Sequence, residues 1–80
     1  RKLVPLVLAE VGCRAYAPAV DEPTDLAVQN PAGDDAVVVV EQWESVAALK
    51  AHTTAPHMAD YRVAVRDFVQ SVSLQVLRPA

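Results

Sequence analysis

Cysteine and glycine are scarce in this chain, and each scarcity excludes a class of protein. The 80 residues contain one cysteine, Cys13, so no internal disulfide can form. The disulfide-stapled folds of small secreted domains are therefore excluded. The two glycines, Gly12 and Gly33, cannot build a glycine-rich phosphate loop. Because clusters of metal ligands are lacking as well, we expect no cofactor: neither a flavin, nor a haem, nor a stoichiometric metal.

Basic charge and long apolar runs are lacking too. Seven Lys and Arg against ten Asp and Glu give a net charge of −3, and the basic residues are scattered. That distribution excludes the basic stripe that nucleic-acid binding requires. The longest apolar run, residues 36–40, is far shorter than the roughly 18 residues of a membrane span. We expect no nucleic-acid partner and no membrane partner, and we assign the chain to the cytoplasm by default.

What the sequence does contain is enough apolar material for one small core. Hydrophobic residues make up 52% of the chain and charged residues 21%, a balance that excludes disorder. A chain of this length forms a single domain, over residues 1–80, and buries only about 60% of its unfolded surface. With no disulfide to add stability, we expect association with a second copy into a homodimer.

Hydrophobic patterning predicts an α+β fold. Residues 2–10 have helical spacing and run into Gly12, the residue type expected just past a helix end. Residues 13–20 and 36–43 read as strands, and four consecutive valines in the second suit a sheet covered on both faces. Residues 21–35 are rich in turn formers and make a long connection. Residues 73–77 alternate as a closing strand.

Two short helices are predicted before that closing strand. Ser45 is a good N-cap for the first. Thr53 or Thr54 is expected to cap the second, with Pro56 tolerated in its first turn. Apolar residues of the second helix recur at three- and four-residue spacing and predict one buried stripe, made of Met58, Tyr61, Val65, Phe68 and Val72.

The order of these elements is helix, strand, strand, helix pair, strand. One more strand in front would complete the ferredoxin-like split β-α-β-β-α-β unit. The chain begins at Arg1 rather than at a methionine, and no such strand is present in it. We therefore expect a ferredoxin-like α+β domain that is truncated at its N-terminus, with the first strand lying before Arg1.

Three segments in succession resemble the antibiotic biosynthesis monooxygenase (ABM) domain family. Residues 10–13 (Glu-Val-Gly-Cys), followed by Tyr16, resemble the family's helix-to-strand junction. Residues 41–45 (Glu-Gln-Trp-Glu-Ser) resemble its Glu-x-Trp-x-Ser strand end. Residues 47–52 and then 56–58 (Pro-His-Met) resemble its helix motif with two histidines around a proline. The resemblance covers nearly the whole chain.

That resemblance implies a ferredoxin-like fold that dimerises through its sheets into a dimeric α+β barrel. It also implies oxidation of electron-rich aromatic compounds, such as quinols, by molecular oxygen without a metal or flavin. Some relatives of this fold instead degrade haem. The chain departs from the family's pattern in two places: a first strand that supplies a pocket Asn in several members is not present, and the connection at residues 21–35 is longer than usual.

The candidate catalytic residues are His57, His52 and Glu41. Histidine is the side chain best suited to proton transfer near neutral pH. A cofactor-free oxygenase needs a base that deprotonates a phenol, so that the anion reduces oxygen directly. Glu41 shares a strand face with Trp43 and must be paired or exposed, so it either orients a histidine or bridges to the partner subunit. The competing interpretation makes both histidines partners for exposed carbonyls at the helix junction.

The candidate substrate-binding residues are Trp43, Tyr16, Met58 and Tyr61. Trp43 offers a flat wall for a planar substrate, Tyr16 a donor to a substrate oxygen, and the other two would line a pocket between helix and sheet. Ordinary packing is the alternative for each. A metal site is not expected, because five-residue spacing separates the two histidines by about 140° on a continuous helix. Three ligands and a second shell would also be needed.

Two functional hypotheses follow. The first is a cofactor-independent monooxygenase that acts with molecular oxygen on a quinol or polyketide-like phenol, with His57 as the base. The second is a non-enzymatic ABM-like dimer that binds a small aromatic or apolar molecule or serves as an assembly module. The absent first strand divides them, because without its polar residue the pocket has few groups to hold an oxygenated anion.

Overall fold

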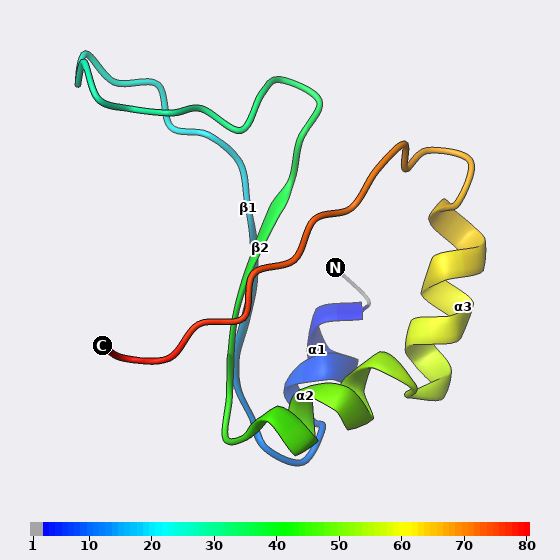
Figure 1. Cartoon of the computed structure of the whole chain (residues 1–80). Helices are drawn as coiled ribbons and strands as arrows, with labels where there is room; N and C mark the ends of the chain where they lie inside the picture. The colour runs from blue at the N-terminus through cyan, green and yellow to red at the C-terminus, as the bar shows by residue number, and fades with distance from the viewer. Residues whose placement is uncertain (1–2) are drawn as a thin grey trace.

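The computed structural model describes residues 3–80 and contains three helices and two strands (Figure 1). In chain order these are α1 (Leu3–Leu8), β1 (Cys13–Ala19), β2 (Val38–Trp43), α2 (Val46–Thr53) and α3 (Pro56–Val65). The predicted helix start at residue 2 lies outside the described residues. No helix within residues 3–80 has the length and apolarity that crossing a membrane requires.

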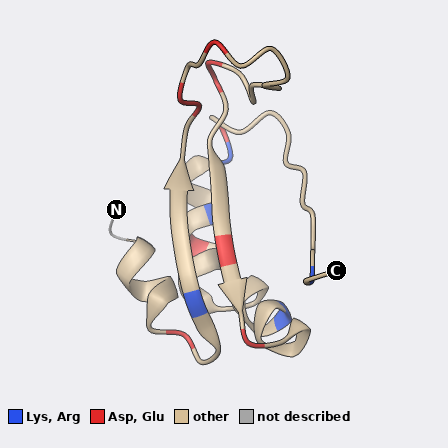
Figure 2. Cartoon of the chain, turned by 90° about the vertical axis from the view of Figure 1, so that its left-hand side faces the viewer, with Lys and Arg blue, Asp and Glu red and all other residues tan. Residues whose placement is uncertain are grey.

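The two strands form an antiparallel sheet, as the strand patterning predicted. Tyr16 lies opposite Glu41, and Ala17 lies opposite Val40. A β-bulge between Cys13 and Ala15 shifts the register at the start of β1. Because side chains alternate along a strand, Glu41 and Trp43 share one face of the sheet with Tyr16. The helices lie behind this face, and the opposite face is left uncovered in the single chain (Figure 2).

The connection between β1 and β2, residues 20–37, extends away from the helices and carries several of the acidic residues (Figure 2). It is held at its base by Asp21, whose carboxylate accepts hydrogen bonds from the backbone N–H groups of Ala32 and Gly33, each at 2.9 Å. These two bonds lower the pKa of Asp21. The long connection predicted from the turn-forming residues is therefore confirmed, with a carboxylate that ties its two ends together.

The prediction of a closing strand at residues 73–77 is wrong for the single chain. Among residues 3–80 the sheet has only two strands, and the C-terminal segment runs past it without regular structure (Figure 1). Alternating apolar residues form a strand only where a neighbouring strand supplies hydrogen-bond partners. The complete split β-α-β-β-α-β arrangement is therefore not present in the described part of the chain, whereas its α+β character is.

The junction of α2 and α3 differs in part from the predicted capping. Ser45 caps α2 as expected, its hydroxyl accepting from the N–H of Ala48 at 3.1 Å. The hydroxyls of Thr53 and Thr54 instead donate backward to carbonyls in the last turn of α2. Ala55 occupies the N-cap position of α3 without a side-chain bond, and the predicted place of Pro56 in the first turn is confirmed.

The predicted buried stripe on α3 is also wrong. The helix ends at Val65, so Phe68 and Val72 lie beyond it and are each 84% exposed. Met58 and Val65 are half-buried and Tyr61 is exposed, so α3 carries no buried residue. Helical spacing buries a face only where another element packs against it. In the single chain, little apolar surface faces this helix.

The core is correspondingly small. Val7 is fully buried, and among residues 3–80 the other buried side chains are those of Tyr16 and His52. All four valines of residues 37–40 are exposed, although the sequence favours a sheet covered on both faces. The helices cover only one face of β2 along part of its length. The buried interior therefore centres on a histidine, and that is where the candidate site lies.

Candidate active site

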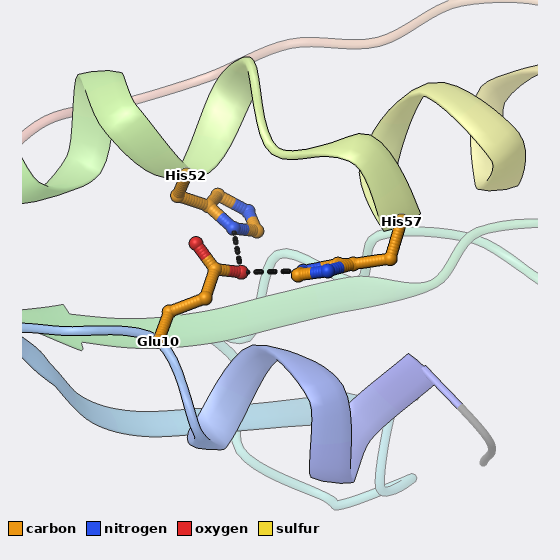
Figure 3. A group of neighbouring side chains, drawn as sticks. All are labelled: Glu10, His52 and His57. Carbon is orange, nitrogen blue, oxygen red and sulfur yellow. Dashed lines mark hydrogen bonds and ion pairs between the residues drawn. The ribbon is translucent and has the colours of Figure 1, made fainter.

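Three side chains that are distant in sequence meet at one carboxylate oxygen (Figure 3). Oε2 of Glu10 lies 2.8 Å from Nδ1 of His52 and 2.7 Å from Nε2 of His57. Glu10 follows α1, His52 lies in the last turn of α2, and His57 lies in the first turn of α3. We call this group the Glu10–His52–His57 cluster.

The break between α2 and α3 brings the two histidines together. The N–H of Ala55 donates to the carbonyl of His52 at 3.1 Å, and Pro56 then starts a new helix in a different direction. The angular separation expected on a continuous helix therefore does not apply, because His52 and His57 belong to different helices. Proline cannot continue the hydrogen-bond ladder of α2, so the sequence itself requires this break.

Gly12 brings Glu10 against α2. Its φ of +84° lies in the left-handed region, where glycine is favoured, and its carbonyl accepts from the N–H of Glu44 at 2.7 Å. A Cβ at this position would lie 2.6 Å from the Cβ of Ala48, so no larger residue fits without displacement. The close approach of this turn to α2 is what allows Glu10 to reach His52.

The cluster is protected from solvent but not sealed. The exposed fractions of the side chains are 6% for His52, 14% for Glu10 and 23% for His57. Burial raises the pKa of Glu10, but the hydrogen bonds and charges of the two histidines outweigh it, so the pKa lies below its usual value. Glu10 is therefore ionised at neutral pH and accepts an N–H from each imidazole.

A second group of side chains surrounds the other side of His52. The ring centroid of Trp43 lies 4.7 Å from that of His52. The ring centroid of Tyr16 lies 5.9 Å from that of His52, and these two rings meet edge to face. Nε1 of Trp43 donates to Oε1 of Glu41 at 2.8 Å, and that same oxygen is 3.9 Å from Nε2 of His52. His52 therefore lies between two carboxylates, with one facing each ring nitrogen.

Tyr16 is held in its protonated form in this environment. Burial, and then the negative charge of Glu41, raise the pKa of its phenol. A phenol that stays protonated at neutral pH is a hydrogen-bond donor.

A groove of about 750 Å³ lies beside Trp43, between β2, α2 and the C-terminal segment. Trp43 and Glu41 line it, together with Arg14, Leu49 and residues 74–79. Five predicted site residues do not line it, namely His52, His57, Tyr16, Met58 and Tyr61. The structure thus joins His52, His57, Glu41, Trp43 and Tyr16 through hydrogen bonds, ion pairs and ring contacts, none of which among residues 3–80 involves Met58 or Tyr61.

Glu10 is the residue that the sequence reasoning missed. Sequence patterns place Glu10 in the segment at residues 10–13 but do not predict it as a site residue, because 42 and 47 residues separate it from the two histidines that it contacts. A usable signal was present: a carboxylate directly after an apolar helix and before a glycine turn. That position places a charge at the edge of the core, where it must be paired.

Comparisons with known proteins place the chain in one family. The sequence profile of a family described as "Antibiotic biosynthesis monooxygenase" matches residues 1–64. The chain is 45% identical over 78 residues to the "Probable quinol monooxygenase YgiN" of Escherichia coli strain K12, an alignment that covers 98% of the chain and 74% of that protein. The proteins of the same name in Escherichia coli O157:H7 and Shigella flexneri are similar to the same extent.

Proposed function

This chain belongs to the antibiotic biosynthesis monooxygenase family, and from that premise we propose that it oxidises a quinol or polyketide-like phenol with molecular oxygen and without a cofactor. The observation that carries the proposal is the contact of His57 with Glu10, at 2.7 Å. A carboxylate that orients a histidine and stabilises its imidazolium suits that histidine to act as a general base. The name of the similar bacterial protein, "Probable quinol monooxygenase YgiN", supports the same substrate class.

His57 is the proposed base, and Glu10 orients it. With Nε2–H donated to Glu10, the Nδ1 lone pair of neutral His57 is available to accept the phenol proton. Glu10 then stabilises the imidazolium that forms. His57 is 23% exposed and so more accessible to substrate than His52, at 6%. We assign His52 and Glu41 to orientation, because His52 shares Oε2 of Glu10 and its other ring nitrogen faces Glu41.

The reaction that this base would promote is balanced without a further reductant. Removal of the phenol proton gives an electron-rich anion, which donates electrons to molecular oxygen. One oxygen atom enters the ring and the other leaves as water with two hydrogens of the quinol, so that quinol and oxygen give a hydroxyquinone and water. Trp43 is proposed as the flat wall of the substrate site, since its ring lies 4.7 Å from that of His52, which shares Oε2 of Glu10 with His57.

A homodimer is part of this proposal. The groove is bounded on one side only by the irregular C-terminal segment, and β2 leaves its valines exposed. A second copy packed sheet to sheet would cover Val38 and Val40, which share the uncovered face, and it would offer residues 73–77 a strand to pair with. The dimeric α+β barrel expected from the family resemblance is the arrangement that does both.

Oxygen uptake by wild type and His57→Ala on a panel of small quinols tests the function. We expect the variant to lose about 10²–10⁴-fold in rate, the usual contribution of a general base. Asp60→Ala, an exposed change in the same helix, is the matched control and should retain full rate. Unchanged uptake in His57→Ala would remove His57 as the base. Quinol binding by a wild type that consumes no oxygen would favour the non-enzymatic ligand-binding dimer.

A further inference from the structure

We propose that the Glu10–His52–His57 cluster is a binding site for a first-row divalent transition-metal ion of the Zn²⁺ class. We further propose that an ion bound there blocks the base. The metal-binding part stands on the geometry of the cluster alone. The inhibition part rests on the function proposed above.

The ligand atoms are of the right kind and almost at the right separation. One imidazole nitrogen from each histidine and one carboxylate oxygen lie within 4.8 Å of one another. Two imidazoles and a carboxylate favour Zn²⁺, Cu²⁺ or Ni²⁺ over Mg²⁺ and Ca²⁺, which prefer oxygen ligands. Metal–ligand bonds of about 2.0–2.2 Å in tetrahedral geometry place neighbouring ligand atoms roughly 3.4 Å apart.

A small outward shift is therefore enough to admit the ion. The two nitrogen–oxygen distances are now 2.7 and 2.8 Å, as expected where protons occupy the space between the atoms. An ion that replaces those protons needs each nitrogen–oxygen pair to separate by roughly 0.6–0.7 Å. The three ligands come from the turn after α1, from α2 and from α3, so each side chain can rotate without moving the other two.

The surroundings of His52 already have the form of a second shell. Metal-bound histidines generally donate their other ring N–H to a carboxylate, which fixes the ring and its tautomer. Oε1 of Glu41 lies 3.9 Å from Nε2 of His52, and Nε1 of Trp43 holds that oxygen in place at 2.8 Å. If Nδ1 of His52 binds the ion, its proton moves to Nε2, where Glu41 is positioned to accept it.

The same rearrangement removes the base. Metal binding at Nε2 of neutral His57 leaves the ring proton on Nδ1, the atom that would otherwise accept the phenol proton. Glu10 binds the ion and no longer stabilises an imidazolium. Because His57 is 23% exposed, the ion has a route into the cluster from that side, and water can fill the fourth position.

Cobalt titration of untagged, chelator-treated protein tests the site through the visible d–d absorption of Co²⁺. We expect saturation at one ion per chain, an intensity typical of four-coordinate geometry, and displacement of Co²⁺ by Zn²⁺. Glu10→Gln and His57→Gln should each weaken binding at least tenfold, and Glu41→Gln should weaken it by about 10–100-fold as a second-shell change. Cys13→Ser removes the one thiol and should leave the affinity unchanged.

Circular dichroism melts establish which variants are folded, and binding is compared among those variants only. His57→Gln, at the more exposed ligand, serves if Glu10→Gln does not fold. Absence of saturable binding to wild type, or equal affinity in a folded ligand variant, would overturn the site.

Oxygen uptake provides the second measurement. One equivalent of Zn²⁺ should stop quinol oxidation, and a chelator should restore it. Saturable binding with undiminished turnover would refute the inhibition. A metal-free wild type without turnover would refute the proposed function, and the cobalt titration would still decide the metal site.

Discussion

At the scale of single residues, the site depends on polar atoms that each serve two partners. Oε2 of Glu10 contacts both histidines, and Oε1 of Glu41 accepts from Trp43 while facing His52. A buried oxygen with two partners positions both of them, since moving either partner leaves the other less well held. Trp43 is consequently more than an apolar wall: it also determines the position of a carboxylate.

Substitutions at Trp43 separate these two roles. Trp43→Phe keeps an aromatic ring but removes the N–H, so it should lower the free energy of unfolding by about 1.5 kcal/mol, the low end of the range for a hydrogen bond to a charged group, because the bond is only partly buried. Trp43→Ala also removes the ring and should cost about 3 kcal/mol, the low end of the range for a buried tryptophan, because Trp43 is half-buried. Urea unfolding measures both changes. Glu41→Gln, which keeps an acceptor oxygen, is the control for the hydrogen bond, and a Trp43→Phe variant as stable as wild type would show that the bond contributes nothing.

At the scale of elements, two chain breaks assemble the cluster. At Pro56 the chain leaves the axis of α2 and begins α3, which places His57 beside His52. At Gly12 the chain turns so that the segment after α1 lies against α2. The helices themselves are short, so they derive little stability from their own hydrogen bonds. The turns between them consequently determine which side chains meet.

Gly12→Ala should destabilise the protein more than Gly33→Ala. Both glycines have positive φ, so each substitution incurs backbone strain on the order of 1–3 kcal/mol. Only at Gly12 does the added methyl group meet another atom, 2.6 Å away, which adds an overpacking cost of roughly 1–3 kcal/mol. Urea unfolding of the two variants isolates the clash, with Gly33→Ala as the control for strain. Equal losses would indicate that the turn and α2 do not approach as closely as described.

At the scale of the whole molecule, a single chain is more open than its length requires. Its radius of gyration is 14.2 Å, whereas a compact domain of this size has about 12 Å. The fully buried core amounts to Val7, while the valines of residues 37–40 are between 38% and 65% exposed. Val38 and Val40 share the uncovered face of the sheet, and an exposed apolar face is typical of a protein–protein interface.

Light scattering at micromolar concentration should therefore report twice the mass of one chain. Val40 lies opposite Ala17 on the uncovered face of the sheet, so Val40→Lys places a charge in the proposed interface and should yield monomer or unfolded chain. Val28→Lys, in the connection and 92% exposed, is the matched control and should leave the dimer intact. A wild type that is a well-folded monomer would contradict the homodimer.

Local patterns in the sequence were sufficient for much of the fold. Valine-rich and alternating residues predicted β1 and β2, Ser45 predicted the start of α2, and Pro56 and Gly12 predicted the two breaks. These features depend on neighbours a few residues apart, and such preferences act wherever the segment is placed. The predictions that did not hold, the strand at 73–77 and the stripe through Phe68 and Val72, each needed a packing partner that the single chain does not supply.

The sequence by itself determined which chemical groups this protein has: two histidines, one tryptophan at the end of a strand, and a single cysteine that cannot form an internal disulfide. Only the tertiary structure decided that a carboxylate 42 residues away from His52 joins the two histidines. The physical reason is the range of the forces involved. Capping, turn formation and helix breaking act within a few residues, whereas pairing of a buried charge is satisfied by whichever partner folding brings near it.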